Sequence, residues 1–552
     1  MKRKNNTIFW ALLAYTIITI VLTYPLILHL NTALYAQPGD AFGMLYDMWR
    51  MTIEKINYFF PGQTLFLGVI RLLRYVFSET IIYNIFILGS FILTGLAGFV
   101  LIKKITKNDV ISMIGGLIFI LCPFRTTQAL QHITFADLSL ILFFIYFLLL
   151  VREKKKWTYL LILSLLFCAI TLINYQYGVF AILIYAIYLL TNFFVPHKKN
   201  KYIFLYSMIS IAISGLIILA INHNFVSDYL LMKNGGQTQY IPDRSYNELN
   251  VYSAKWFYYF LPSPDNPIFG QYTAKYYDDI VGTLKTNRTE QIIYLGIVNI
   301  IFAIVAIFNY KKIDKFIFWF AILLIIFGIY FSFAPIMPFL GIDITAPGAI
   351  LYNIMPFVRV YCRLGLLAYF GIAILSLYGI YFVYEKISKN YLKTIFIVAV
   401  LILILSDLLV LPKNRIAKVD AQSMPMAYST LESLPTGTIA EYPQLPAEEP
   451  LSYEYLLWKR VHQLPTITNY TGSVTENDLR KSILDPSKLE TIQKLKTNGV
   501  KYIIIHKNKY LTEKAQKYPQ EYNFGIVPDL DTSALGLDYL GDYNGDLLYR
   551  IN

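Results

Sequence analysis

The stretch IIYNIFILGSFILTGLAGFVLIKK, residues 81–104, decides what kind of fold this chain has. Its first 22 residues carry no charged side chain. As a helix, such a run is long enough to cross a hydrocarbon core of about 30 Å. It ends at Lys103 and Lys104, and cations of this kind collect on the inner side of a membrane. The stretch therefore predicts a membrane-spanning helix that ends on the cytoplasmic side.

Ten further apolar stretches lie along the 552 residues, of which 56% are hydrophobic and 15% charged. This composition is too apolar for a soluble protein of that length, so the chain is predicted to be a polytopic α-helical membrane protein. The eleven predicted spans are 8–30, 81–102, 110–124, 134–151, 157–173, 178–196, 203–221, 291–309, 316–333, 364–383 and 394–411. The Gly115-Gly116 pair in the shortest of them indicates a kink or a close contact between helices.

Lysine and arginine indicate the side of the membrane on which each connection lies. With the N-terminus inside, six inner segments hold 19 basic and four acidic residues, and the rest of the chain has a net charge of −2. The formal net charge of +13 therefore reflects topology and gives no indication of nucleic-acid binding. The prediction is a multi-pass protein of the cytoplasmic (inner) membrane with a cytoplasmic N-terminus.

The predicted membrane domain covers residues 1–411. Its long outer loops are 31–80, 222–290 and 334–363. In the first of these loops, TLFLGVIRLLRYVF (64–77) places Arg71 and Arg74 three residues apart within an apolar run, which suits a helix lying in the membrane interface.

From Pro412 onward charges and turn residues return, and 412–552 is predicted to be a soluble α/β domain. Asp485 and Gly499 are suited to cap a helix that leads into the strand VKYIIIH. The Asn544-Gly545 pair between alternating apolar residues indicates a hairpin. With eleven crossings, this domain lies on the outer face.

Two acidic residues follow the first span in QPGDAFGMLYDMWRM, residues 37–51. Asp40 lies about ten residues beyond the span, where a carboxylate can meet both water and a lipid head. Asp47 follows seven residues later, about two helical turns, so both side chains share a face if 41–50 is helical. The alternative is that these loop acids serve solubility.

Three arginines stand out on the outer side, where cations are otherwise few. Arg125 lies at the outer end of a span, and Arg359 and Arg363 are four residues apart, on one face of a helix that enters the membrane. Guanidinium forms paired, charge-assisted hydrogen bonds with phosphate, which makes a phosphate one natural partner. Lipid headgroups and snorkelling at helix ends are the alternatives.

Other outer polar and aromatic residues are candidates for substrate contact. They are Gln131, His132, Tyr175, Tyr177, Lys255 and Trp256. Trp256 also fits an aromatic belt at the headgroup level. Asp265 in PSPDNP is either a further acidic group or part of a turn. In the outer domain, His462 and Asn469 are candidates for contact with a glycan.

The order of these motifs resembles the GT-C superfamily of integral membrane glycosyltransferases, most closely the bacterial GT-C-like polytopic membrane proteins. The resemblance rests on PGDAFGMLYDMWR, CPFRTTQALQH, NYQYG, YSAKWFYYFLPSPDNPIFG, YLGIVN, FVRVYCRLGLLA, LPTITNYTG and NGVKYIIIH, and it covers nearly the whole chain. It implies transfer of a sugar from a polyprenyl-phosphate donor to an envelope glycan, glycolipid or protein acceptor on the outer face.

By this resemblance Asp40 matches the acid of the first outer loop, which acts as general base in an inverting transfer. Arg125, Arg359 and Arg363 are the implied phosphate-binding residues. Asp47 and Asp265 are secondary acidic candidates. Many members of the superfamily carry paired acids in this loop, some of them for metal, whereas here the second acid is seven residues away. No metal site is therefore carried over, and the requirement for a divalent metal or another cofactor stays open.

Two other classes of function stay open. A transporter or flippase of lipid-linked sugars usually buries ionisable groups within its helices. The predicted spans are almost free of such groups: Asp137 and Asp407 lie near outer helix ends. A non-catalytic membrane scaffold with a glycan-binding outer domain is the other alternative.

Overall fold

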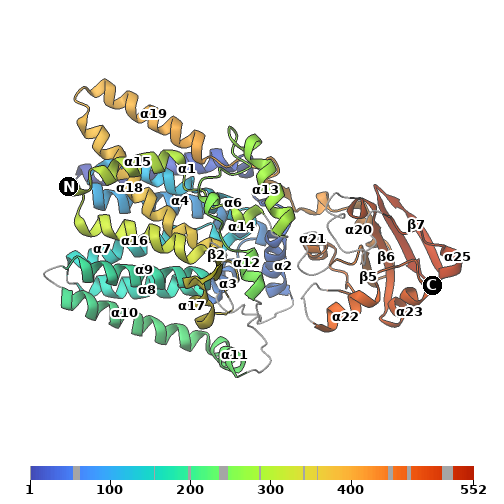
Figure 1. The fold of residues 1–552 in the computed structure, drawn as a ribbon. Coiled ribbons are helices and arrows are strands. Elements are labelled where there is room, and N and C mark those ends of the chain that lie inside the picture. The colour runs from blue at the N-terminus through green and yellow to red at the C-terminus, as the bar shows by residue number, and fades with distance from the viewer. Residues whose placement is uncertain are drawn as a thin grey trace. The chain divides into compact units, whose positions relative to one another are not determined.

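The structure is a computed structural model (Figure 1). The residues that it describes are 2–53, 63–154, 156–196, 200–234, 246–284, 288–339, 342–356, 358–445, 452–468, 474–511 and 526–552. Parts of all three predicted outer loops, and Asn469, lie outside these ranges.

The chain divides into two units. The helical unit comprises Met1–Tyr24, Tyr58–Leu72 and Ile85–Arg415, and the C-terminal unit comprises Pro25–Asn57, Leu73–Asn84 and Ile416–Asn552. The boundary after Arg415 lies four residues beyond the predicted one. The structure differs from the predicted division in one larger respect, because most of the first outer loop belongs to the C-terminal unit.

Eleven apolar helices coincide with the eleven predicted spans. They are α1 (Lys2–Thr23), α4 (Glu79–Thr106), α5 (Asp109–Ile120), α7 (Ser139–Glu153), α8 (Trp157–Ile173), α9 (Tyr175–Phe194), α10 (Asn200–Ile221), α15 (Ile297–Phe308), α16 (Lys315–Ser332), α18 (Gly365–Lys386) and α19 (Asn390–Leu408). In the described part of the chain, seven are long and apolar enough to cross a membrane. The shorter apolar helices among the eleven are α5, α8, α15 and, from Thr7 to Thr23, the apolar part of α1.

Helix α18 is buried along most of its length and forms the centre of the helical unit between α15 and α16. Glycines allow these helices to approach closely. A Cβ atom on Gly379 would lie 1.9 Å from the carbonyl oxygen of Phe302, and one on Gly371 would lie 2.4 Å from that of Ala321. Close backbone contact through small residues is typical of membrane helix packing.

Changing Gly379 to leucine is expected to destabilise the helical unit by about 1 to 3 kcal/mol, because the new side chain overlaps the backbone of α15. Thermal unfolding of the purified protein in detergent measures the effect. Gly89→Leu in α4 is the matched control, since a Cβ at Gly89 meets no atom within 4 Å. Equal unfolding temperatures for the two variants would contradict the close approach.

The Gly115-Gly116 pair of α5 lies at another close contact. A Cβ on Gly116 would lie 2.1 Å from the hydroxyl of Tyr15 in α1 and 2.4 Å from the carbonyl oxygen of Gly95 in α4. The predicted close contact between helices is therefore present at this pair. On the other side of the unit, α8, α9 and α10 run side by side (Figure 1).

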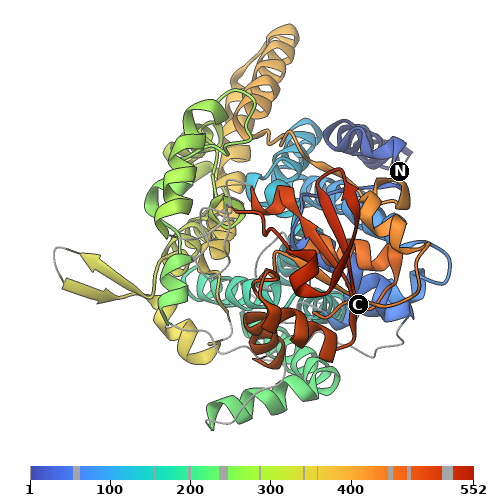
Figure 2. The same ribbon diagram turned by 90° about the vertical axis from the view of Figure 1, so that its right-hand side faces the viewer.

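Shorter elements connect these helices. They are α3 (Thr64–Leu73), α6 (Pro123–Gln128), η2 (Ile133–Phe135), α11 (His223–Lys233), α12 (Tyr246–Val251), η3 (Trp256–Tyr259), α13 (Gly270–Leu284), α14 (Arg288–Gln291), η4 (Tyr310–Lys312), β2 (Ile336–Phe339), β3 (Ile342–Thr345), α17 (Pro347–Ile354) and η5 (Tyr361–Leu364). Helix α3 occupies the stretch predicted to lie in the interface. Strands β2 and β3 pair antiparallel (Figure 2).

The C-terminal unit is built on a sheet of order β5-β6-β8-β7 (Figure 2). Its strands are β5 (Thr438–Tyr442), β6 (Val500–His506), β7 (Leu537–Tyr543) and β8 (Asp546–Ile551). Strands β5 and β6 are parallel, whereas β7 and β8 form the predicted hairpin, in which Asn544 has a φ of 58°. Helix α23 (Leu489–Thr497) leads into β6 as predicted. The other elements of this part are η6 (Ala421–Ser423), α20 (Met426–Leu431), α21 (Ser452–His462), α22 (Val474–Ser482), α24 (Lys507–Tyr510) and α25 (Thr532–Leu535).

The first outer loop joins this unit by three kinds of contact. Strand β1 (Ala33–Tyr35) pairs antiparallel with β4 (Ile416–Lys418). Helix α2 (Asp40–Ile53) packs on α21, with Gly43 so close to the ring of Tyr453 that a Cβ would lie 2.8 Å from it. Buried Glu79 is paired with Arg74 at 2.6 Å and with Arg460 at 2.5 Å.

Candidate functional site

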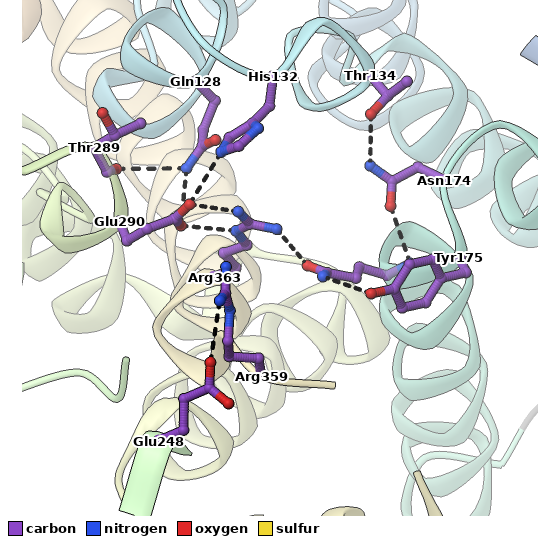
Figure 3. A network of polar contacts seen from close by, with 11 residues as sticks. Gln128, His132, Thr134, Asn174, Tyr175, Glu248, Thr289, Glu290, Arg359 and Arg363 are labelled. Atoms are coloured by element: carbon purple, nitrogen blue, oxygen red, sulfur yellow. Dashed lines mark hydrogen bonds and ion pairs between the residues drawn. The ribbon is translucent and has the colours of Figure 1, made fainter. Parts of the chain in front are cut away.

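A buried polar cluster lies in the helical unit where several helix ends meet. We call it the Glu290 cluster. Its members are Gln128, His132, Glu290 and Arg363, which Figure 3 labels, and Gln176, which accepts a hydrogen bond from Arg363. Glu290 comes from α14 and Arg363 from η5, 73 residues later in the chain. Gln128 ends α6, His132 precedes η2, and Gln176 lies in the first turn of α9. Chain segments far apart in sequence therefore converge on one carboxylate.

Glu290 accepts hydrogen bonds on both carboxylate oxygens. Oε2 accepts from Nε of Arg363 at 2.8 Å and from the amide of Gln128 at 3.2 Å. Oε1 accepts from Nη2 of Arg363 and lies 3.2 Å from Nε2 of His132. The pair is bidentate, which is the stronger arrangement of guanidinium and carboxylate.

The pair is almost completely enclosed, with exposed side-chain fractions of 6% for Arg363 and 4% for Glu290. Burial alone would raise the pKa of Glu290, but the charge of Arg363 and hydrogen bonds from His132 and Arg363 outweigh it and hold this pKa well below its usual range. Glu290 is therefore ionised at all physiological pH values and is poorly suited to carry a proton.

Gln176 links the cluster to a neighbouring cavity. Its Oε1 accepts from Nη1 of Arg363 at 2.6 Å, and its Nε2 donates to the hydroxyl of Tyr175 at 3.2 Å. Asn174 orients this helix start, because its side chain accepts from the backbone N–H groups of Gln176 and Tyr177 and donates to Thr134 at 3.1 Å.

The cavity has a volume of about 500 Å³ and an almost wholly apolar lining. Tyr175 lines it at the start of α9. The other lining residues are Thr171 of α8, Ile218 and Leu219 of α10, Asn222 after α10, Val226, Tyr229 and Leu230 of α11, Ile354 of α17 and Met355 after α17. The structure therefore places an apolar cavity one side chain away from a buried, charged cluster.

The three predicted phosphate-binding arginines occupy different environments. Arg125 is completely buried; it donates to the carbonyl oxygen of Ile120 at 2.9 Å and to Ser90 at 3.2 Å, and lies 3.7 Å from the ring centre of Phe91. Arg363 is bound within the Glu290 cluster. Arg359 pairs with Glu248 at 3.0 Å and keeps a side-chain exposure of 36%. Of the three, Arg359 is the most accessible to a ligand.

The predicted substrate-contact residues also occupy different environments in the structure. His132 is brought to Glu290, and Tyr175 to the cavity. Tyr177 is buried and donates to the carbonyl oxygen of Phe135 at 2.7 Å, which is a contact within the fold. Gln131 is partly buried beside His132.

Lys255 and Trp256 lie at the start of η3. Burial lowers the pKa of Lys255, which is half-buried. Trp256 is exposed, with 69% of its surface accessible. An exposed indole at this position remains compatible with both an aromatic belt and a ligand contact.

The acidic residues that the sequence predicts as site residues are not members of the Glu290 cluster. Asp40 is exposed at the first residue of α2, and Asp47, two turns later, is 45% exposed and lies 3.6 Å from Arg50. The two carboxylates share a helix face, as their spacing predicts. Asp265 lies in a turn, where its backbone N–H donates to Ser263 at 3.2 Å.

Glu290, the residue at the centre of the cluster, belongs to none of the sequence motifs described above. One signal was present: Glu290 directly precedes the apolar span 291–309, at the same predicted outer side as Arg363. An acid and a base at neighbouring helix ends can pair when the helices pack together. In the described part of the chain, no three His, Cys, Asp or Glu side chains are arranged to hold a metal ion.

These features define a polytopic membrane protein with a buried ionic cluster beside an apolar cavity and a separate α/β unit. Residues 65–408 match the family model described as Domain of unknown function (DUF6311). The match covers more than half of the chain, which therefore belongs to the DUF6311 family.

Solved structures with similarity to the chain include two of an archaeal enzyme. The first is the oligosaccharyltransferase AglB from Archaeoglobus fulgidus in complex with an inhibitory peptide and a dolichol-phosphate, at 12% identity and a TM-score of 0.42, covering 91% of this chain and 70% of that chain. The second is the Archaeoglobus fulgidus oligosaccharyltransferase in complex with Zn and sulfate, at 11% identity and a TM-score of 0.47, covering 91% and 68%. Among curated proteins, none matches the sequence of this chain.

Proposed function

We propose that the protein is a membrane glycosyltransferase that moves a sugar from a polyprenyl-phosphate-linked donor to a cell-envelope glycan, glycolipid or protein acceptor on the outer face. The observation that carries the proposal is the apolar cavity next to the Glu290 cluster. A lipid-linked sugar has a hydrocarbon tail joined to a charged head, and an apolar cavity close to polar groups suits such a molecule.

In this proposal the cavity holds part of the isoprenoid tail. Met355 and Ile354 line the cavity, and Arg359 follows four residues after Met355. Arg359 is the favoured phosphate-binding residue, because its ion pair with Glu248 is partly exposed and such pairs contribute little net stability. Arg125 and Arg363 then act by positioning the helix ends around the site.

Asp40 is the proposed general base. Its carboxylate accepts the proton of the acceptor hydroxyl while that oxygen attacks the anomeric carbon and the bond from this carbon to the phosphate oxygen breaks. The leaving phosphate takes the bonding electrons, and a cation such as Arg359 stabilises the charge that develops on it. Asp47 is less suited to this role because Arg50 lies beside it.

Filling the cavity is expected to weaken donor use. Leu219→Trp should raise the KM for a polyprenyl-phosphate sugar about tenfold, since forcing a larger side chain into the tail's place costs about 1 to 3 kcal/mol. The measurement is sugar transfer by the purified protein in lipid nanodiscs, with a panel of radiolabelled polyprenyl-phosphate sugars and an envelope extract as acceptor.

Leu216→Trp is the matched control for this experiment. Leu216 lies on the same helix, is 69% exposed and does not line the cavity. Equal KM values for the two tryptophan variants would remove the cavity from the donor site. Absence of transfer with every donor in the panel would count against the enzyme itself.

Buried ionisable groups at helix ends also fit the alternative of a transporter or flippase for lipid-linked sugars. Glu290 and Arg363 are such groups, and His132 beside them is partly buried. The two functions are separated by following a fluorescent polyprenyl-phosphate sugar in proteoliposomes without acceptor. Movement of the intact lipid between leaflets would favour the transporter, and its absence together with transfer in nanodiscs would favour the enzyme.

A further inference from the structure

A second cavity, of about 620 Å³, lies within the C-terminal unit. We call it the His506 pocket. It is lined by residues of η6, α20, α21 and α24 and of the turn between β7 and β8, and by His506 at the carboxyl end of β6. In open α/β sheets, ligands bind beyond the carboxyl ends of parallel strands, and β5 and β6 are the parallel pair of this sheet.

The floor of the His506 pocket is a chain of buried polar side chains. Tyr428 donates its hydroxyl proton to Glu441, and the same hydroxyl lies 3.4 Å from Nε2 of His506. Nδ1 of His506 lies 2.7 Å from a carboxylate oxygen of Asp546. The rings of Tyr455 and His506 are stacked, with centres 5.2 Å apart. Each ring is thereby held in one orientation, which makes the floor rigid.

The charged side chains around the pocket have partners within the same unit. Lys509 forms an ion pair with Glu454, and both line the pocket. Asp546 lies 2.7 Å from His506, and Glu441 accepts the hydrogen bond from Tyr428 in the floor of the pocket. An anion such as phosphate would have to break the Lys509 ion pair, whereas a neutral ligand can bind without separating charges.

The walls combine aromatic surfaces with amide groups. Trp458 and Tyr543 are partly buried, packed against the core beneath the pocket, and line it. The amides of Gln422, Asn508 and Asn544, all of them exposed, provide donors and acceptors around the rim. A ligand that matches this lining has a flat apolar face and several hydroxyl groups.

We propose that the His506 pocket binds a neutral sugar ring. A pyranose has C–H groups on its face that pack against aromatic rings and hydroxyls at its edge that bond to amides and carboxylates. The cavity volume lies within the range of about 300 to 1,000 Å³ that is common for small-ligand sites. This binding does not depend on transfer chemistry, so it can hold or fail independently of the proposed function.

His462, which the sequence predicts as a glycan contact, does not line the His506 pocket. His462 is buried and stacks on Tyr428 with ring centres 4.9 Å apart. Burial, followed by the charge of Lys459, lowers the pKa of His462 to about 3, so this ring is neutral. His462 therefore supports the floor from behind and does not contact the ligand.

The test is saturation-transfer-difference NMR on the full-length protein in nanodiscs, without any lipid-linked donor. The probes are glucose, galactose, mannose, N-acetylglucosamine and the disaccharides maltose and cellobiose, with glucuronate, glucosamine and inorganic phosphate as charged comparisons. The wild type is expected to bind at least one neutral sugar.

Gln422→Trp is expected to weaken that binding at least tenfold, because an exposed side chain on η6 is replaced by one that fills the pocket. Gln493→Trp on α23 is the matched control, since Gln493 is exposed in the same unit and does not line the pocket. Asn508→Ala removes one rim amide and should weaken binding without affecting the core. Absence of binding by every neutral sugar, or equal affinity of the two tryptophan variants, or binding of charged probes alone, would overturn the proposal.

Discussion

Replacing Glu290 with alanine is expected to destabilise the helical unit by about 3 to 5 kcal/mol, because Arg363 is left buried without its counter-charge. The same change removes one hydrogen-bond acceptor of Gln128 and a contact of His132. Thermal unfolding in detergent, together with the yield of monodisperse protein, measures the loss. A fall in unfolding temperature no larger than that of a surface variant would show that the cluster is not a structural centre.

Two comparisons make this result specific. Glu248→Ala breaks the pair with Arg359, which has the same chemistry but side-chain exposures of 26% and 36%, and should change stability by at most about 1 kcal/mol. The double variant Glu290→Leu with Arg363→Leu removes both charges and should recover much of the stability, since apolar pairs often replace buried ion pairs without loss. If the double variant is as unstable as Glu290→Ala, the loss of stability arises from packing and not from the unpaired charge.

The stability that the Glu290–Arg363 pair contributes depends on pH in a direction set by the lowered pKa of Glu290. The pKa of Glu290 is lower in the folded protein than the ordinary glutamate value of about 4.3. The ion pair therefore contributes its full stability above that ordinary value and loses it as the pH falls through the folded pKa. Glu290 should cause no change in stability between about pH 5 and pH 8.

Asp40→Asn is expected to reduce the rate of sugar transfer by about 10²- to 10⁴-fold, the contribution usual for a general base. Asparagine has nearly the shape of aspartate but cannot accept the proton of an attacking hydroxyl at neutral pH. Because Asp40 is exposed at the start of α2, folding should be unaffected. The measurement is kcat in the nanodisc transfer assay with saturating donor.

Asp47→Asn is the matched control, since it makes the same chemical change on the same helix face. Its rate should stay within a few-fold of the wild type, because Asp47 is paired with Arg50 and has no assigned role in the reaction. Equal losses in the two variants would indicate an effect on α2 as a whole. Unchanged transfer by Asp40→Asn would remove this residue as the base.

The membrane helices could be predicted because the signal for each is local. A hydrocarbon environment requires about twenty apolar residues in a row, and every predicted span coincides with an apolar helix. The strand 500–506 and the hairpin at Asn544-Gly545 were likewise predictable from short-range patterns. The number of helices long enough to span the membrane was harder to predict, because α5 ends at Ile120, before the apolar run 110–124 ends, and α15 begins at Ile297, after the run 291–309 begins.

Pairing between distant residues could not be predicted in the same way. Arg125 and Arg363 were predicted to bind phosphate. In the structure the guanidinium of Arg125 donates to the carbonyl oxygen of Ile120 and the hydroxyl of Ser90, and that of Arg363 donates to Glu290. Which acid meets which base depends on the packing of helix ends 73 residues apart. Arg363 could therefore be predicted from its local motif, whereas its partner Glu290 could not.

The sequence by itself determined the class of the protein, the positions of its apolar helices and the existence of an α/β region, because hydropathy and turn chemistry act over short stretches of chain. Only the tertiary structure decided that most of the first outer loop belongs with the C-terminal unit, that Glu290 organises a buried cluster, and that His506 and Asp546 line a pocket. These arrangements arise from burial and ion pairing between segments far apart in sequence, and such contacts leave no periodic pattern along the chain.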